Sequence, residues 1–380
     1  MNRYLCSRIL FFLLFMVGMK VFSGVYVAVV LWAGPVGAQE IPVDTAFGRE
    51  ALWDAGSGCR SDMACEEAAF LRSMPAGLQK RQERAVREAM SGNTEALNAV
   101  RRARNVPPDY PAGIEVTEIG DTYRLYRPSG AARRKLPVLM YLHGGGWCFG
   151  SLNSCARFCA QLAREAGVAV LAVDYPLAPE APYPAALNAC AEALGMIDRR
   201  AEEWGIDRCR VSVGGDSAGG NLALALALRE NALCGQTANG RMDPAIRSLV
   251  LFYPVVKCWA EDNEYWRKYG EGFGLDASLM EAFNEAYAGQ TNRREPLLSP
   301  ACATDEQLAA LPPTLIVSAG HDILCGQGAE FAGRLAALGV AVKRFELVSA
   351  SHLFITVPGQ SEAFRAAVRL TAGFMNGEEP

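Results

Sequence analysis

From residue 113 onward, short apolar runs alternate with longer stretches that have helical spacing. Runs that are apolar at nearly every position, such as Leu136–Leu142 (LPVLMYL) and Ser248–Tyr253 (SLVLFY), are typical of strands buried on both faces of a parallel sheet. The other predicted strands are Thr117–Arg127, Val168–Val173, Cys209–Val213, Thr314–Ser318 and Val342–Val348. Because buried strands alternate with helical stretches, the pattern predicts an α/β fold with a mostly parallel sheet and helices on both faces.

The predicted helices fall between these strands, at Ser154–Gly167, Tyr183–Trp204 and Asn221–Arg229. The segment 39–112 differs, because it is helical and charged, with breaks at Gly and Pro. We expect its helices to lie over the core of residues 113–376 rather than to form a separate fold.

The first 38 residues are predicted to be a signal peptide. Residues 9–36 are apolar apart from Lys20 and a few small polar residues, and the small residues Val36 and Ala38 form an export-type cleavage site. Cleavage after Ala38 would place the product in the periplasm or outside the cell.

Lys20 interrupts the apolar run. In a membrane span it would lie near mid-bilayer and cost roughly 2.5–3.5 kcal/mol. Our hypothesis is that translation begins at Met19, so that Met19 and Lys20 form the basic start of the signal peptide. The alternative is an uncleaved anchor through residues 9–34, which would be the protein's attachment to a membrane.

Composition argues against some classes of function and binding site. The net charge is −4 and the basic residues are scattered, which argues against a nucleic-acid partner. The sequence has neither CxxC pairs nor an HExxH motif, so we expect no metal and no cofactor. Twelve cysteines, of which eleven would remain after cleavage, are many for a cytosolic enzyme, and export makes disulfides an expectation whose pairing the sequence does not reveal.

A nucleophile motif stands between a predicted strand and a predicted helix. Gly215-x-Ser217-x-Gly219 follows Cys209–Val213 and precedes Asn221–Arg229, which fits a nucleophile elbow. The glycines leave room for a sharp turn, and the helix N-terminus favours negative charge beside the serine. A glycine-rich turn that binds phosphate or only packs would show the same motif, and the motif alone leaves that alternative open.

A run of glycines supports the hypothesis that Ser217 is a nucleophile. Gly144, Gly145 and Gly146 come directly after the strand Leu136–Leu142, and their backbone N–H groups are unobstructed. Acyl transfer needs such donors for the oxyanion, each worth roughly 3 kcal/mol. The N–H of Ala218, the residue after the serine, is a further predicted donor.

The chain has three histidines from which a catalytic base can be chosen. His143 belongs to the glycine loop and is predicted to be structural, and His321 is predicted to be a surface or packing residue. His352 follows the strand Val342–Val348, as a base in this type of fold should.

The acid is expected between the serine and the histidine in the sequence. Asp322 follows the strand Thr314–Ser318, whereas Asp305 and Glu306 are predicted to lie solvated in the preceding loop. The order Ser217, Asp322, His352 predicts a triad in which the histidine takes the serine proton and the aspartate fixes the imidazole tautomer.

The combined motifs resemble the hormone-sensitive-lipase-like esterases, bacterial family IV of the α/β hydrolases. The residues that carry the resemblance are HGGGW at His143–Trp147, DYPLAPE at Asp174–Glu180, GDSAGGNLA at Gly215–Ala223, YPVV at Tyr253–Val256, LPPTLIVSAGHDIL at Leu311–Leu324, and His352. The resemblance implies the α/β-hydrolase fold, the triad named above, and oxyanion donors chiefly at Gly145, Gly146 and Ala218.

The resemblance also implies a helical cap, built from segment 39–112 and an insertion at about 257–298. The insertion is rich in aromatic residues, most of which we expect to be ordinary helix packing. Some positions depart from the family pattern: Pro176 in place of Arg, Leu353 in place of Gly, Cys325 in place of Asp, and Cys148 beyond the glycine loop. Of these, Leu353 and Cys148 bear on the shape of the pocket.

The resulting prediction is a serine carboxylesterase that hydrolyses uncharged esters of small to medium acyl chains without a cofactor. Two alternatives remain. An amidase or acyltransferase would use the same triad, and a non-catalytic binding protein would keep the hydrolase scaffold but be expected to lose a triad member. The partner is a small-molecule ester, and a homodimer is left open.

Overall fold

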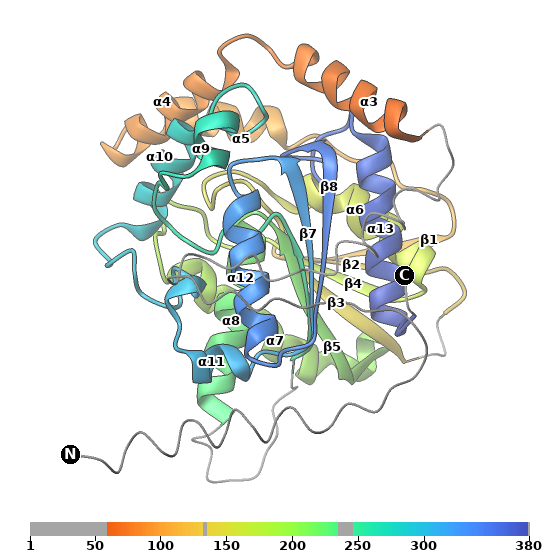
Figure 1. The fold of residues 1–380 in the computed structure, drawn as a ribbon. Helices are drawn as coiled ribbons and strands as arrows, with labels where there is room; N and C mark the ends of the chain where they lie inside the picture. Colours follow the sequence, from red (N-terminus) through yellow and green to blue (C-terminus); the bar gives the residue numbers. More distant parts are fainter. Residues whose placement is uncertain (1–58, 132–134, 235–245, 379–380) are drawn as a thin grey trace, which may run out of the picture. The chain divides into compact units, whose positions relative to one another are not determined.

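The computed structural model describes residues 59–131, 135–234 and 246–378, and within these ranges the side chains from residue 63 onward except those of residues 233 and 234. Its centre is an eight-stranded sheet (Figure 1). The strands are β1 (Ile114–Ile119), β2 (Tyr123–Pro128), β3 (Leu136–Leu142), β4 (Ala169–Val173), β5 (Ile206–Asp216), β6 (Ile246–Phe252), β7 (Thr314–His321) and β8 (Val342–Ser351). Their order is β1-β2-β4-β3-β5-β6-β7-β8. The predicted signal peptide and residues 39–58 lie outside the described part.

The sheet is mostly parallel, as predicted. Strands β4, β3, β5, β6, β7 and β8 pair in parallel, and β1 and β2 add an antiparallel hairpin at the β4 edge. The prediction of one strand over Thr117–Arg127 was therefore wrong. Gly120 adopts φ +59° and begins a turn that separates the two strands, and a backbone angle of that sign favours glycine.

The strand register brings the motif residues to one edge of the sheet. Leu142, the last residue of β3, lies opposite Gly215 on β5, so the glycine loop and the elbow leave the sheet side by side. At the other side, His321 on β7 lies opposite Ser351 on β8. The residues that follow, Asp322 and His352, therefore also start from neighbouring positions.

Helices cover both faces of the sheet (Figure 1). On one face α6 (Leu152–Ala166) packs against α13 (Ser361–Asn376). The opposite face carries α7 (Ala185–Trp204), α8 (Ala218–Cys234) and α12 (Cys325–Ala337). Alternate residues of β3 point to the two sides: Leu139 and Tyr141 join the core under α6, whereas Val138 and Met140 join the core under α8.

The remaining helices connect or overlie the sheet. They are α3 (Cys59–Ser73), α4 (Leu78–Met90), α5 (Glu95–Arg104), α9 (Glu264–Tyr269), α10 (Ala277–Ala288), α11 (Asp305–Ala309) and the 3₁₀ turn η1 (Pro300–Cys302). Figure 1 shows α4, α5, α9 and α10 gathered at one end of the sheet, and α4 packs directly on α10. Two segments nearly 200 residues apart in the sequence thus meet above the same strand ends.

Asp305 and Glu306 are exposed, as predicted, but they lie in a short helix rather than in a loop. Asp305 and Glu306 begin the short helix α11, and Thr304 caps it by accepting a hydrogen bond from the Gln307 N–H. Asp305 is also paired with Arg334 of α12 at 2.7 Å. Asp305 and Glu306 therefore lie in the first turn of a helix, and Asp305 also forms a surface ion pair.

Arg101 connects α5 to two loops that follow strands β3 and β4. Its guanidinium donates to the backbone oxygens of Cys148 and Ala178, both at 2.9 Å, and to the carboxylate of Glu180 at 2.7 and 2.8 Å. Cys148 adjoins the glycine loop, so this arginine connects the N-terminal helices to the loop.

Removing that connection should destabilise the protein. Arg101→Ala leaves two partly buried carbonyl groups without a charged donor, and we expect the free energy of unfolding to fall by about 3 kcal/mol in urea denaturation. Arg102→Ala on the same helix is the matched control, because the Arg102 side chain is exposed and makes no hydrogen bond to any residue that the structure describes. It should change stability by less than about 0.5 kcal/mol. Equal losses in the two variants would contradict this role.

The disulfides expected from the cysteine count are not found where the structure describes the side chains. Nine cysteines there are free thiols: Cys65, Cys148, Cys155, Cys159, Cys190, Cys209, Cys258, Cys302 and Cys325. The side chains of Cys6, Cys59 and Cys234 lie outside that part. Among the described helices, none has the length and apolarity needed to cross a membrane.

Candidate active site

Ser217 sits in a strained turn between β5 and α8. Its φ is +55°, a left-handed value that is costly for a residue with a side chain and persists only where the surroundings enforce it. The glycines on either side enforce it. A Cβ on Gly215 would come within 2.8 Å of the Gly219 carbonyl oxygen, and a Cβ on Gly219 would overlap the Leu142 carbonyl oxygen. The chain can turn this sharply only because both positions lack side chains.

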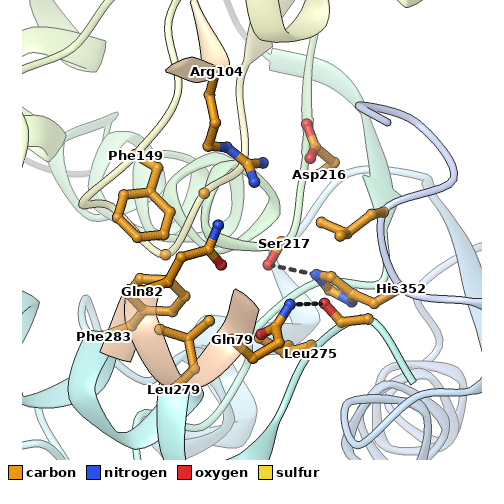
Figure 2. Close-up of a pocket in the computed structure, with 14 residues that line it drawn as sticks. Gln79, Gln82, Arg104, Phe149, Asp216, Ser217, Leu275, Leu279, Phe283 and His352 are labelled. Atoms are coloured by element: carbon orange, nitrogen blue, oxygen red, sulfur yellow. Dashed lines mark hydrogen bonds between the residues drawn. The ribbon is translucent and has the colours of Figure 1, made fainter. Parts of the chain in front are cut away.

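The structure brings Ser217, His352 and Asp322 together in one hydrogen-bonded chain. His352 Nε2 lies 3.2 Å from Ser217 Oγ, and His352 Nδ1 lies 2.7 Å from Asp322 Oδ2 (Figure 2 shows the serine and histidine). All three side chains are buried. This is the geometry in which a histidine can remove a serine proton while a carboxylate holds its other ring nitrogen.

Neighbouring groups hold the histidine and the aspartate in place. The second oxygen of Asp322 accepts a hydrogen bond from the Leu324 N–H at 3.0 Å, so both carboxylate oxygens are engaged. The His352 ring packs on the Tyr253 ring, with centroids 4.3 Å apart. Gln360 Nε2 donates to the backbone oxygen of His352 at 3.2 Å. These contacts reduce the freedom of the imidazole before any substrate binds.

The glycine loop lies beside the serine, but its members are not equivalent. Gly145 and Gly146 line the same pocket as Ser217. The N–H of Gly144 instead donates to Asp216 Oδ1 at 3.0 Å, so it is already engaged. This differs from the expectation that all three glycine amides serve as oxyanion donors. It leaves Gly145, Gly146 and Ala218 as the candidates.

Asp216 positions the loop against the elbow, a role that the sequence analysis missed. Its buried carboxylate oxygen also accepts a hydrogen bond from the Tyr141 hydroxyl at 2.9 Å. Burial raises the pKa of Asp216 above its ordinary value, and the hydrogen bonds from Tyr141 and Gly144 act in the opposite direction. The sequence signal that could have revealed this role is the position of Asp216, an acidic residue directly before Ser217 in the glycine-rich turn.

Comparisons with known proteins show the family to which the chain belongs. A family model described as the α/β-hydrolase fold matches residues 139–356, more than half of the chain. The chain belongs to the α/β-hydrolase family. The match is to the hormone-sensitive-lipase-like branch, which confirms the resemblance drawn from the motifs.

Individual relatives and solved structures give the same assignment. An ethyl acetate hydrolase from Pseudomonas putida is 38% identical over 240 residues, which cover 61% of this chain and 70% of that protein. An α/β hydrolase of Acanthamoeba polyphaga mimivirus is 34% identical, and the match covers 61% of this chain and 64% of the viral protein, just under two thirds. The crystal structure of a thermostable esterase from Pseudomonas putida superposes with a TM-score of 0.67 at 28% identity, covering 81% of this chain and 94% of that one.

The other two histidines of this hydrolase do not line the pocket with Ser217. His143 is fully buried, stacks on Tyr175 with ring centroids 4.3 Å apart, and donates from Nδ1 to the Gly144 carbonyl oxygen at 3.0 Å. His321 pairs with Glu67 of α3 at 2.8 Å and packs near Tyr269. Their contacts are those of packing residues.

The pocket over Ser217 is a small cavity of about 30 Å³ that is partly open to solvent. Its apolar lining comes mainly from Phe149, Leu275, Leu279, Phe283 and Leu353. Polar side chains come from the N-terminal helices, with Gln79 and Gln82 on α4 and Arg104 on α5 (Figure 2). The sequence analysis missed these three residues, because no motif marks them.

Among the aromatic residues of the insertion, only Phe283 lines this pocket. Tyr287 instead stacks on Trp147 with ring centroids 4.3 Å apart, and Trp266 and Tyr269 are buried in the core. Most of the aromatic residues in the insertion therefore pack between helices. Within the described residues, no group of three or more His, Cys, Asp or Glu side chains is arranged to hold a metal ion.

Leu353 is the departure from the family pattern that reaches the site. It follows the triad histidine, adopts φ +79° and lines the pocket. The positive φ gives a physical reason why glycine usually stands at this position in the family. In this hydrolase the leucine side chain narrows the pocket beside His352.

Proposed function

We propose that the protein is a serine carboxylesterase that hydrolyses esters of small to medium acyl chains through an acyl-enzyme intermediate. The observation that carries the proposal is the unbroken hydrogen-bonded chain Ser217–His352–Asp322 at the floor of a mostly apolar pocket. Membership in a family whose relatives include an ethyl acetate hydrolase supports the same reaction class.

In the first step, Ser217 Oγ attacks the ester carbonyl carbon and His352 Nε2 takes the hydroxyl proton. The tetrahedral intermediate then expels the alcohol, and His352 returns the proton to the alcohol oxygen as the C–O bond breaks. Asp322 keeps the imidazole in the tautomer that presents Nε2 to the serine and stabilises its charged form. The products of this half-reaction are the free alcohol and acylated Ser217.

In the second step, water takes the place of the alcohol. His352 removes a proton from the water as its oxygen attacks the acyl carbon, and then protonates Ser217 Oγ as the acid leaves. The net reaction consumes one ester and one water and yields one acid and one alcohol. No cofactor is needed for either step.

The negative charge of each tetrahedral intermediate falls beside backbone amides. We assign the oxyanion donors to Gly145, Gly146 and Ala218, with Gly144 excluded because its N–H donates to Asp216. Ala218 begins α8, whose dipole adds a positive field at the same place. The bond from Asp216 to the loop orients these donors in advance, which is what makes such donors effective.

The helices α4, α5 and α10 form the cap in this proposal. They supply pocket residues from both segments predicted from the resemblance, namely 39–112 and the insertion at about 257–298. By enclosing the ester, the cap lowers the local dielectric and strengthens the interactions at the oxyanion. A p-nitrophenyl ester series on protein starting at Gln39 would test the activity and define the acyl length, and an amide series would test the amidase alternative.

The role of Asp322 gives a separate prediction. Asp322→Asn preserves the shape of the side chain, but the amide favours the imidazole tautomer that leaves Nε2 protonated and unable to accept the serine proton. We expect kcat for ester hydrolysis to fall about 10⁴-fold. Asp305→Asn, at a surface ion pair, is the matched control and should retain activity. Full activity in Asp322→Asn would remove this residue from the mechanism.

A further inference from the structure

Arg104 is a cation at the candidate active site, and its guanidinium has no hydrogen-bond or ion-pair partner among the residues that the structure describes. It is the last residue of α5, and it lines the pocket above Ser217. Its Nε is enclosed by protein and makes no hydrogen bond to any residue that the structure describes. Figure 2 shows its guanidinium pointing into the pocket. Arg104 as a whole is partly buried, and its enclosed Nε–H costs free energy because a polar group removed from water needs a compensating hydrogen bond.

Arg101, one turn earlier on α5, differs from Arg104 because its guanidinium nitrogens have hydrogen-bond acceptors. Arg101, on the same helix, places its guanidinium nitrogens on two backbone oxygens and on the Glu180 carboxylate. Arg104 makes only a ring contact, with its guanidinium carbon 5.7 Å from the Phe149 ring centroid. The difference between the two side chains is that Arg104 faces the space where a substrate binds.

The nearest acidic group does not neutralise Arg104. Asp216 lines the same pocket, but its carboxylate is held by Tyr141 and Gly144 and lies outside ion-pair distance of the guanidinium. Burial lowers the pKa of Arg104 from its ordinary value, while the Asp216 charge raises it. Because a guanidinium is the most basic side chain in proteins, Arg104 stays charged.

A second polar group faces the same space. Gln82 of α4 is buried, and it makes no hydrogen bond among the described residues. Gln79, one turn earlier on α4, is by contrast fixed by Gly274 and Asp276. The pocket thus presents a guanidinium and a primary amide, both without partners and both able to donate to one anion.

We propose that the preferred substrate is an ester whose acyl part carries a second, ionised carboxylate, bound by Arg104 and Gln82. This deepens the proposed function and rests on it, and it replaces the expectation of uncharged esters. Hydrolysis of such a half-ester yields a dicarboxylate and an alcohol. A guanidinium pairs with carboxylate in a two-pronged geometry, so Arg104 selects for this group rather than only attracting negative charge.

The arrangement around Ser217 places the carboxylate on the acyl side. In Figure 2, Arg104, Gln82 and Phe149 lie on one side of Ser217, and His352 lies on the other. The alcohol oxygen must face His352 to receive its proton, so the acyl chain extends from the serine toward Arg104. Phe149 and Phe283 then contact the methylene groups between the two carbonyl carbons.

The test compares the monomethyl esters of succinate, glutarate and adipate with the matching dimethyl esters, by release of methanol near neutral pH. Wild-type protein should show a higher kcat/KM for at least one monoester than for its diester. In Arg104→Gln the ratio of the two kcat/KM values should fall by about 10- to 100-fold. Arg104→Lys should recover part of the ratio, since it restores the charge but not the planar fork. Acetylated glycolate carries its carboxylate on the alcohol side, and its hydrolysis is followed by release of acetate. It should not be preferred over the uncharged ester methyl acetate in the same acetate assay.

Arg102→Gln is the matched control, because Arg102 is exposed on the same helix. It should leave the ratio unchanged. A wild-type preference for every diester, or equal losses on both esters in Arg104→Gln, would overturn the proposal while leaving the esterase function in place. A preference for acetylated glycolate instead would overturn the acyl-side assignment. No turnover of any ester would overturn both the proposal and the proposed function.

Discussion

Replacing Ser217 with alanine is expected to lower kcat for ester hydrolysis about 10⁶-fold. The variant loses the nucleophile, while the backbone donors and the pocket remain, so only weak residual catalysis by water should persist. The measurement is steady-state hydrolysis of a short p-nitrophenyl ester. His352→Ala should cause a loss of similar size, because serine and histidine act as one unit and their contributions do not add.

The comparison requires that the variant is folded. Ser217 is held in its turn by backbone bonds, from its N–H to the Phe252 oxygen at 2.9 Å and from the Asn221 N–H to its own oxygen at 3.1 Å. Alanine keeps both bonds, so circular dichroism and the melting temperature should be close to wild type. A folded Ser217→Ala variant with substantial turnover would contradict the mechanism.

The second large effect is structural. Gly219→Ala should destabilise the protein by about 3 kcal/mol or more, because its Cβ would overlap the Leu142 carbonyl oxygen and come within 2.7 Å of the His143 oxygen. Both contacts are with backbone of the strand end and the glycine loop, so relief requires moving the elbow away from β3. We expect a lower melting temperature and a loss of activity together.

Gly373→Ala is the matched control for this substitution. Gly373 is also helical, in α13, and a Cβ there meets nothing within 4 Å. Alanine is the better helix former, so this variant should be neutral or more stable by up to about 1 kcal/mol. A Gly219→Ala variant as stable and active as Gly373→Ala would show that the elbow does not need a glycine at this position.

The sheet and the meeting of the three polar residues could be predicted because they follow from local patterns. Apolar runs mark strands buried on both faces, and in a parallel sheet the residues after those strands gather at one edge. Asp322 and His352 follow opposed residues of β7 and β8, so their proximity is a consequence of register. The roles of these residues were assigned from the order of serine, aspartate and histidine along the sequence.

Other features depend on contacts that no local pattern encodes. The hairpin of β1 and β2 looked like one strand, because the turn that separates them is short, spanning residues 120–122, and begins at Gly120 with a positive φ. Gly144 looked equivalent to Gly145 and Gly146 until Asp216 was found to hold its N–H. Arg104 was one of many arginines in a charged helical segment, and its place in the pocket follows from how α4 and α5 pack over the sheet.

The central claim is that Ser217 is the activated nucleophile. The most direct test is intact-mass analysis followed by peptide mapping after treatment with a fluorophosphonate. The account predicts a single adduct, located on Ser217, with loss of ester turnover in proportion to labelling and no adduct in His352→Ala on the same timescale. An adduct on a different serine that accompanies the loss of activity, or undiminished labelling without the histidine, would contradict it.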